Sequence, residues 1–219
     1  MIPPPDFGSG EPTHGRQSDG GMNLETVNWR ENYRVRIGAA LGILFICRAR
    51  PRNLFFLLLG LAVSALGILL RQWAAGCLVK NDELARSGPY SFVRNPLYLG
   101  SLLAALGLIL ASTSFSHIFI LKYPYFDRSL LFWSALWIMI DSIYLPKIEK
   151  EERLLKEKFG VVFENYAGKV PRILPRLADL KKLDFSSFNA ELWKKNEEFW
   201  SIAGYLLICA FLIAGYIIR

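Results

Sequence analysis

Two polar segments of the sequence hold the residues whose types and spacing suit chemistry. The first, Ser87–Gly100, reads Ser-Gly-Pro-Tyr-Ser-Phe-Val-Arg-Asn-Pro-Leu-Tyr-Leu-Gly. The second, 151–160, opens with two glutamates and ends with Phe-Gly, and Val-Pro-Arg-Ile-Leu-Pro follows at 170–175. A carboxylate pairs with an organic cation, and a helix N-terminus receives an anion. The combination fits a small ligand that carries both kinds of charge.

The geometry of a helix limits how these residues can act. Glu151 and Glu152 point about 100° apart around a helix, so only one of them can face a ligand squarely. Lys147 precedes Glu151 by four residues and shares its face. The first N–H groups of a helix that begins at Pro96 can receive a carboxylate, and Tyr90 can line a flat apolar slot.

At these positions the sequence resembles the isoprenylcysteine carboxyl methyltransferase family and, more loosely, the phospholipid N-methyltransferases. The shared signature is Gly-x-Tyr, then Arg-His-Pro-x-Tyr-x-Gly, then a later Glu-Glu, and the resemblance covers residues 71–176. It implies an S-adenosylmethionine-dependent membrane methyltransferase with a lipophilic acceptor. A prenylcysteine-like carboxylate is the first choice of acceptor, and a phospholipid amine is the alternative.

The resemblance also implies roles for individual residues. Its cofactor contacts fall on Asp82, Glu83, Leu84, Ala85, Tyr90, Asn95, Pro96, Leu97, Tyr98, Glu151 and Glu152. Arg94 and Lys147 take catalytic positions, and Lys147 holds the acceptor carboxylate in line with the methyl group. A carboxylate is already ionised at neutral pH, so this chemistry needs no general base. No metal is implied.

The sequence departs from the family pattern at two positions. Asn95 stands where the signature has His, although an amide can still donate a hydrogen bond to the cofactor carboxylate. Phe163 replaces the first Tyr of Phe-Gly-x-x-Tyr-x-x-Tyr, and Tyr166 keeps the second. Two other functions stay open: a sterol-type reductase that binds a reduced nicotinamide, whose phosphates the acidic pair would repel, and a membrane scaffold without catalysis.

The elements that must position these residues follow from uncharged apolar runs. Hydrophobic residues make up 53% of the 219 residues, and charged residues make up 21%. About 20 apolar residues in a helix cross a bilayer. Three runs approach or pass that length: 53–70, 95–121 and 199–218. Two more, 37–47 and 129–140, are shorter. The sequence therefore predicts an all-α, multi-pass transmembrane bundle of about five spans with a cytosolic catalytic cap.

The distribution of Lys and Arg predicts the orientation. The net charge of +7 comes from loops beside apolar runs, which favours a topology signal over nucleic-acid binding. Residues 147–182 hold ten Lys and Arg, which places this segment and the connection at 71–94 in the cytosol. The N-terminus is then cytosolic and the C-terminus external. Arg48, Arg50 and Arg52 conflict with this arrangement, so a re-entrant first hairpin stays an alternative.

The chain divides into four parts on this interpretation. Residues 1–26 form a tail expected to be disordered and without a secretory signal, and 27–73 form an interfacial segment and a transmembrane hairpin. The methyltransferase core is 74–177, and 178–219 forms a charged linker and a last span. Three scattered cysteines indicate neither disulfide nor metal site. The oligomeric state stays open.

Local signals predict several details of the core. Pro146 is expected to kink the fourth helix, which continues out of the membrane until Gly160 ends it. An amphipathic stretch over 161–177 is expected to lie on the membrane surface over the site. Asp141 is expected either in a buried hydrogen bond or at an interfacial position facing the bundle. Gly38 and Gly42 have the spacing of a close helix contact.

Overall fold

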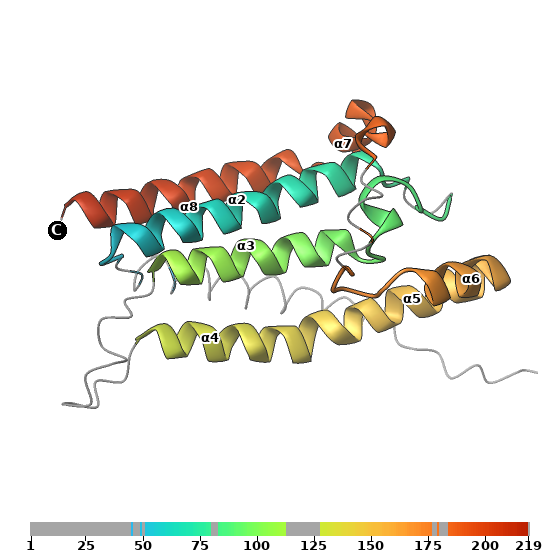
Figure 1. The fold of residues 1–219 in the computed structure, drawn as a ribbon, viewed down its shortest axis with the longest axis horizontal. Helices are drawn as coiled ribbons and strands as arrows, with labels where there is room; N and C mark the ends of the chain where they lie inside the picture. Colours follow the sequence, from blue (N-terminus) through green and yellow to red (C-terminus); the bar gives the residue numbers. More distant parts are fainter. Residues whose placement is uncertain are drawn as a thin grey trace, which may run out of the picture. The chain divides into compact units, whose positions relative to one another are not determined.

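The computed structural model describes residues 45, 49, 51–79, 83–112, 128–176, 179 and 184–218. These residues form helices and no strands, which confirms the all-α prediction for this part of the chain. The elements in chain order are α2 (Leu54–Gly76), η1 (Gly88–Ser91), α3 (Pro96–Ser112), α4 (Arg128–Met139), the π-helix η3 (Ile140–Tyr144), α5 (Leu145–Phe159), α6 (Val161–Lys169), η5 (Phe185–Ser187), α7 (Ala190–Lys195) and α8 (Phe199–Ile217) (Figure 1).

Two of these helices are long and apolar enough to cross a membrane. They are α2, with 23 residues, and α8, with 19, while α3 is a shorter apolar helix of 17 residues. The outer face of α8 exposes Leu206, Leu207 and Phe211 by more than half, as a lipid-facing helix does. The predicted spans at 53–70 and 199–218 correspond to α2 and α8, whereas most of 37–47 lies outside the described residues.

Small residues bring α2 and α3 into backbone contact along their length. The two stripes are Gly60, Ser64 and Gly67 on α2, and Gly100, Ala104, Gly107 and Ala111 on α3. A Cβ on Gly107 would overlap the backbone of Ser64 and Gly60, and one on Gly67 would overlap Ala104. In lipid the hydrophobic effect does not drive helices together, so close backbone packing of this kind supplies the attraction between them. The antiparallel α2–α3 pair is therefore the rigid centre of the fold.

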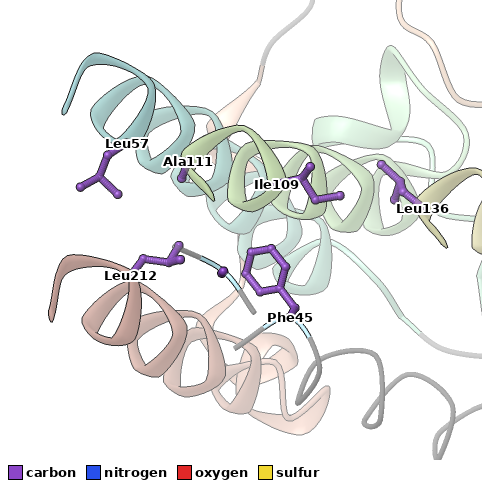
Figure 2. Packing of buried hydrophobic residues seen from close by; sticks show 7 residues of the cluster. Phe45, Leu57, Ile109, Ala111, Leu136 and Leu212 are labelled. Carbon is purple, nitrogen blue, oxygen red and sulfur yellow. The ribbon is translucent and has the colours of Figure 1, made fainter. Parts of the chain in front are cut away.

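Apolar side chains from several elements pack at the end of the α2–α3 pair where α2 begins and α3 ends. Leu57 of α2, Ile109 of α3, Leu136 of α4 and Leu212 of α8 are buried in one cluster, and Phe45 joins them (Figure 2). The ring of Phe45 also meets Phe132, with ring centroids 4.9 Å apart. This cluster ties α4 and α8 to the central pair.

The helix that begins at Arg128 continues through a π segment into α5. Pro146 has no N–H to donate to the residue four positions earlier, and the wider turn of η3 directly precedes it. The N–H of Leu145 accordingly bonds to the carbonyl of Ile140, five residues back. The predicted irregularity at Pro146 thus takes the form of a π-helix. Asp141 within it is exposed, so the expected buried hydrogen bond is not formed.

Only the first part of the amphipathic stretch expected over 161–177 is helical. Gly160 ends α5 with φ +50, as predicted. Then α6 ends at Lys169, because Val170 precedes a proline and adopts extended backbone. The expected charged linker contains η5 and α7, and Asn189 caps the N-terminus of α7 through bonds from Glu191 N and Leu192 N.

Candidate active site

Contacts between distant segments gather the ends of four helices at one end of the bundle. Arg71 near the end of α2 bonds Ser101 of α3 and pairs with Glu198, which precedes α8, at 2.6 Å. Tyr98 in the first turn of α3 bonds Glu151 of α5. The two chemistry-bearing segments therefore lie on the same side of the bundle.

The buried centre of this end is the carboxylate of Glu152. Its Oε1 lies 3.1 Å from Arg94 Nε in an ion pair and accepts a hydrogen bond of 3.0 Å from Asn95 Nδ2. Its Oε2 accepts from Arg172 Nε, and Arg172 Nη2 lies 3.1 Å away. Only 8% of Glu152 is exposed. A carboxylate so enclosed holds the protein together and is not presented to a ligand.

The turn before α3 is fastened to the segment after α6 by further bonds. Arg94 N donates to Pro171 O at 2.9 Å, and Arg94 Nη1 donates to Ala167 O at 2.9 Å. Both amide hydrogens of Asn95 are used, because its second bond goes to Arg172 O at 3.1 Å. Arg94 and Asn95 therefore act as positioning residues here, and the amide of Asn95 has no hydrogen left for a cofactor carboxylate.

Tyr166 makes the most buried of the hydrogen bonds that join these segments. Its hydroxyl donates to Tyr90 O at 2.7 Å, and both rings are buried. Burial raises the pKa of both phenols above their ordinary value, so both stay neutral in the folded protein at high pH. Phe163, the departure from the family pattern, is buried beside Tyr166 with ring centroids 6.3 Å apart. An apolar ring suits that position.

Replacing Tyr166 by Phe should lower the free energy of unfolding by about 1 to 2 kcal/mol, because Tyr90 O would lose its buried donor. Chemical denaturation in detergent measures the difference. The raised pKa gives a second signature: the stability contributed by neutral Tyr166 is complete below pH 10.0, its ordinary pKa, and is lost as pH rises further. Tyr166→Phe should therefore weaken alkaline destabilisation, and an unchanged alkaline profile would contradict the assignment.

Glu151 is presented differently from its neighbour. Its side chain is 45% exposed, Tyr98 donates a 2.7 Å hydrogen bond to its Oε1, and Lys147 Nζ lies 3.9 Å from the same atom. The ammonium of Lys147 is 5.7 Å from the centre of the Tyr98 ring, which meets Tyr144 edge to face at 5.5 Å. An acid, a cation and two aromatic rings thus lie next to one another, and Lys147 shares a helix face with Glu151 as their spacing predicts.

A small apolar pocket lies beneath these groups. Its free volume is about 20 Å³, and its lining includes Tyr98, Tyr144, Ile140 and Ile148. That volume holds about one water molecule and is far below the size of a nucleoside ligand. The pocket is large enough only for part of an apolar chain.

The remaining predicted site residues divide into two groups. Ala85 and Leu97 pack against the cluster in which Tyr90 is buried with Ala74 and Cys77. Tyr90 is therefore a support for the turn and does not line a slot. Glu83 is exposed and Leu84 partly exposed on the same connection, while Asp82 lies outside the described residues.

Two site residues were missed by sequence reasoning. Arg172 lies in the Val-Pro-Arg segment but received no role, although a basic residue beside a proline turn was visible. Tyr144 gave no signal, because its approach to Tyr98 depends on the π segment of α4–α5.

Comparison with known proteins adds a family match. Residues 54–160 match the phospholipid methyltransferase family. The match covers just under half of the chain. It confirms the resemblance to the isoprenylcysteine carboxyl methyltransferases and their relatives. The match and the apolar helices α2 and α8 both point to a membrane protein.

Two curated relatives are similar to part of the chain. The chain is 32% identical to the cobalt-zinc-cadmium resistance protein CzcN of Cupriavidus metallidurans, over 55% of this chain and 48% of that protein. It is 30% identical to the nickel-cobalt-cadmium resistance protein NccN of Alcaligenes xylosoxydans xylosoxydans, over 55% of this chain and 49% of that one. The chain thus spans about half the length of these relatives. No solved structure matches.

Proposed function

We propose that this chain, which matches the phospholipid methyltransferase family over residues 54–160, transfers a methyl group from S-adenosylmethionine to a lipophilic acceptor beside Glu151. The observation that carries the proposal is the hydrogen bond between Tyr98 and Glu151, which joins the first turn of α3 to α5 at the mouth of the apolar pocket. It brings together the acid, the aromatic rings and the helix N-terminus that such a cofactor requires.

The residues present fit the charges of the cofactor. The carboxylate of Glu151 can pair with its ammonium or sulfonium, and the rings of Tyr98 and Tyr144 attract a cation placed over them. The N-terminus of α3 begins at Pro96, and the first N–H groups of a helix have no carbonyl partner within it. Those N–H groups can receive the cofactor carboxylate.

The acceptor side rests on Lys147 and the pocket. The half-exposed ammonium of Lys147 can hold an acceptor carboxylate, and the apolar pocket can hold the start of its hydrocarbon chain. S-adenosylmethionine, when bound, supplies an electrophilic methyl group on a positively charged sulfur. The acceptor oxygen forms the new O–C bond, and the S–C electron pair stays on sulfur. The preferred acceptor is a prenylcysteine-like carboxylate, and a phospholipid amine is the alternative.

The membrane arrangement extends this proposal. We place the chain as a multi-pass protein with the site facing the cytosol, because the Lys and Arg of 147–182 accumulate beside it. Acceptors then arrive laterally from the bilayer. The names of the two relatives concern metal resistance, and among the described residues no group of three His, Cys, Asp or Glu side chains that could hold a metal ion is found.

Replacing Glu151 by Gln should weaken S-adenosylmethionine binding at least about tenfold, since a charge-assisted pair is lost. Calorimetry on the detergent-solubilised protein measures this directly. Glu157→Gln, an exposed change on the same helix, is the matched control and should bind like wild type. Binding of reduced nicotinamide in place of S-adenosylmethionine would support a reductase and refute the proposal. Equal binding by wild type and Glu151→Gln would remove Glu151 from the site.

A further inference from the structure

The segment Asp184–Glu198, here called the strap, lies outside the family match but packs on the end of α2. Asn196 Nδ2 donates to Ala75 O at 2.8 Å and to Leu78 O at 3.0 Å. Asn189 N donates to Gly76 O at 2.9 Å. The N–H of Cys77 already bonds to Ala74 O and that of Leu78 to Ala75 O, so the strap adds a second cap to the end of α2 from outside the helix.

The same segment presses on the connection that leaves α2 toward the site. The Phe188 ring lies against Gly76, where a Cβ would overlap it. Ser187 Oγ lies 3.4 Å from Cys77 Sγ. A Cβ on Gly88, whose φ is +56, would come within 2.7 Å of both Cys77 Sγ and Ser187 Oγ. The turn that leads into η1 and α3 is therefore backed by the strap.

Further side-chain hydrogen bonds fix the strap to the body of α2. Trp193 Nε1 donates to Gln72 Oε1 at 2.6 Å, and Arg71 Nη2 donates to Glu198 at 2.6 and 2.7 Å. Arg71 also bonds Ser101, five residues into α3. The strap is thus anchored on both helices whose ends support the site, and its position is tied to theirs.

We propose that the strap is a positioning element of the cofactor site and that Asn196 is its main positioning residue. The inference rests on the proposed function, because residues 83–85 of the connection and the start of α3 are the expected cofactor contacts. With the cap in place, the connection between α2 and α3 is held in one position beside the start of α3. Without it the connection opens locally, and the cofactor must then bind a less populated arrangement.

Cys77 offers a probe of this opening that is independent of catalysis. It is buried beneath Ser187, and burial raises the pKa of its thiol, so a maleimide should react with it slowly. In the full chain with Cys47→Ser and Cys209→Ser, Cys77 is the remaining cysteine. Asn196→Ala should increase its labelling rate about tenfold and raise the Kd for S-adenosylmethionine by a similar factor, with kcat at saturation unchanged.

Matched variants separate positioning from general damage. Lys195→Ala, an exposed change next to Asn196, should behave like the parent. Asn196→Gln keeps the amide donors and should restore part of the affinity. Trp193→Phe keeps an aromatic ring but removes the indole N–H that bonds Gln72. It is the variant to test in the same way if Asn196→Ala does not fold. Unchanged labelling and unchanged affinity in Asn196→Ala would overturn the positioning role of the strap and leave the proposed function intact. A parent protein that binds no S-adenosylmethionine would overturn the proposed function, and with it the role of the strap in that function.

Discussion

Replacing Glu152 by Gln is expected to lower the free energy of unfolding by about 3 to 5 kcal/mol, the largest effect of any change near the site. The variant keeps the shape of the side chain but leaves the guanidinium of Arg94, which is 13% exposed, without its anion. Arg172 loses one of its two carboxylate partners and keeps Glu149, and Asn95 loses a charged acceptor. Denaturant or thermal unfolding in detergent measures the loss.

The neighbouring glutamate is the control for this prediction. Glu151→Gln removes the same charge one residue earlier, where the side chain is 45% exposed, and should change stability by less than about 1 kcal/mol. The two variants should therefore separate: Glu152→Gln loses stability first, whereas Glu151→Gln loses cofactor binding with stability kept. Equal stability losses would show that Glu152 is not the buried anchor described here.

Gly107→Ala is expected to disrupt the α2–α3 pair and to cost about 3 kcal/mol or more, because backbone must move to admit one methyl group. Its Cβ would overlap Ser64 and Gly60, and no flexible side chain is there to give way. Purification yield and unfolding in detergent measure the effect. Gly204→Ala on α8 is the matched control, since a Cβ there meets nothing within 4 Å. It should be neutral or slightly stabilising. Similar behaviour of the two variants would contradict the backbone contact between α2 and α3.

The helices that carry no chemistry were the easiest to predict from sequence. Uncharged runs fixed α2 and α8 to within a few residues, and Pro96 marked the start of α3 as a first-turn proline should. The contact between α2 and α3 was visible as small residues spaced three and four apart but was overlooked in favour of Gly38 and Gly42, which lie outside the described residues.

The location of the candidate site was predictable from sequence, but the roles of its individual residues were less so. Sequence placed Glu151 and Glu152 on different sides of one helix, so that only one of them could face the ligand squarely, and the family resemblance favoured Glu151. It could not show that Arg94 and Asn95 turn toward Glu152, because that depends on Pro171 and Arg172 returning from far along the chain. Long-range pairing of this kind leaves no local periodicity.

The strap escaped prediction for a related reason. Residues 181–195 read as a charged linker, and the cap at Asn189 is a short signal. The role of Asn196 depends on the carbonyls of Ala75 in α2 and Leu78 just after it, which lie more than a hundred positions earlier in the chain. A side chain that caps a distant helix cannot be recognised from its own neighbourhood.

The most direct test of the account is transfer of a labelled methyl group. The protein in lipid vesicles is incubated with S-adenosylmethionine tritiated on the methyl group and a prenylcysteine or an aminophospholipid. Wild type and Glu157→Gln should label the prenylcysteine in a form that alkali releases as methanol, the mark of an ester, and Glu151→Gln should not. Label that alkali does not release from the aminophospholipid would move the acceptor to an amine. Absence of transfer to either acceptor, with labelling equally absent in all three proteins, would contradict the account.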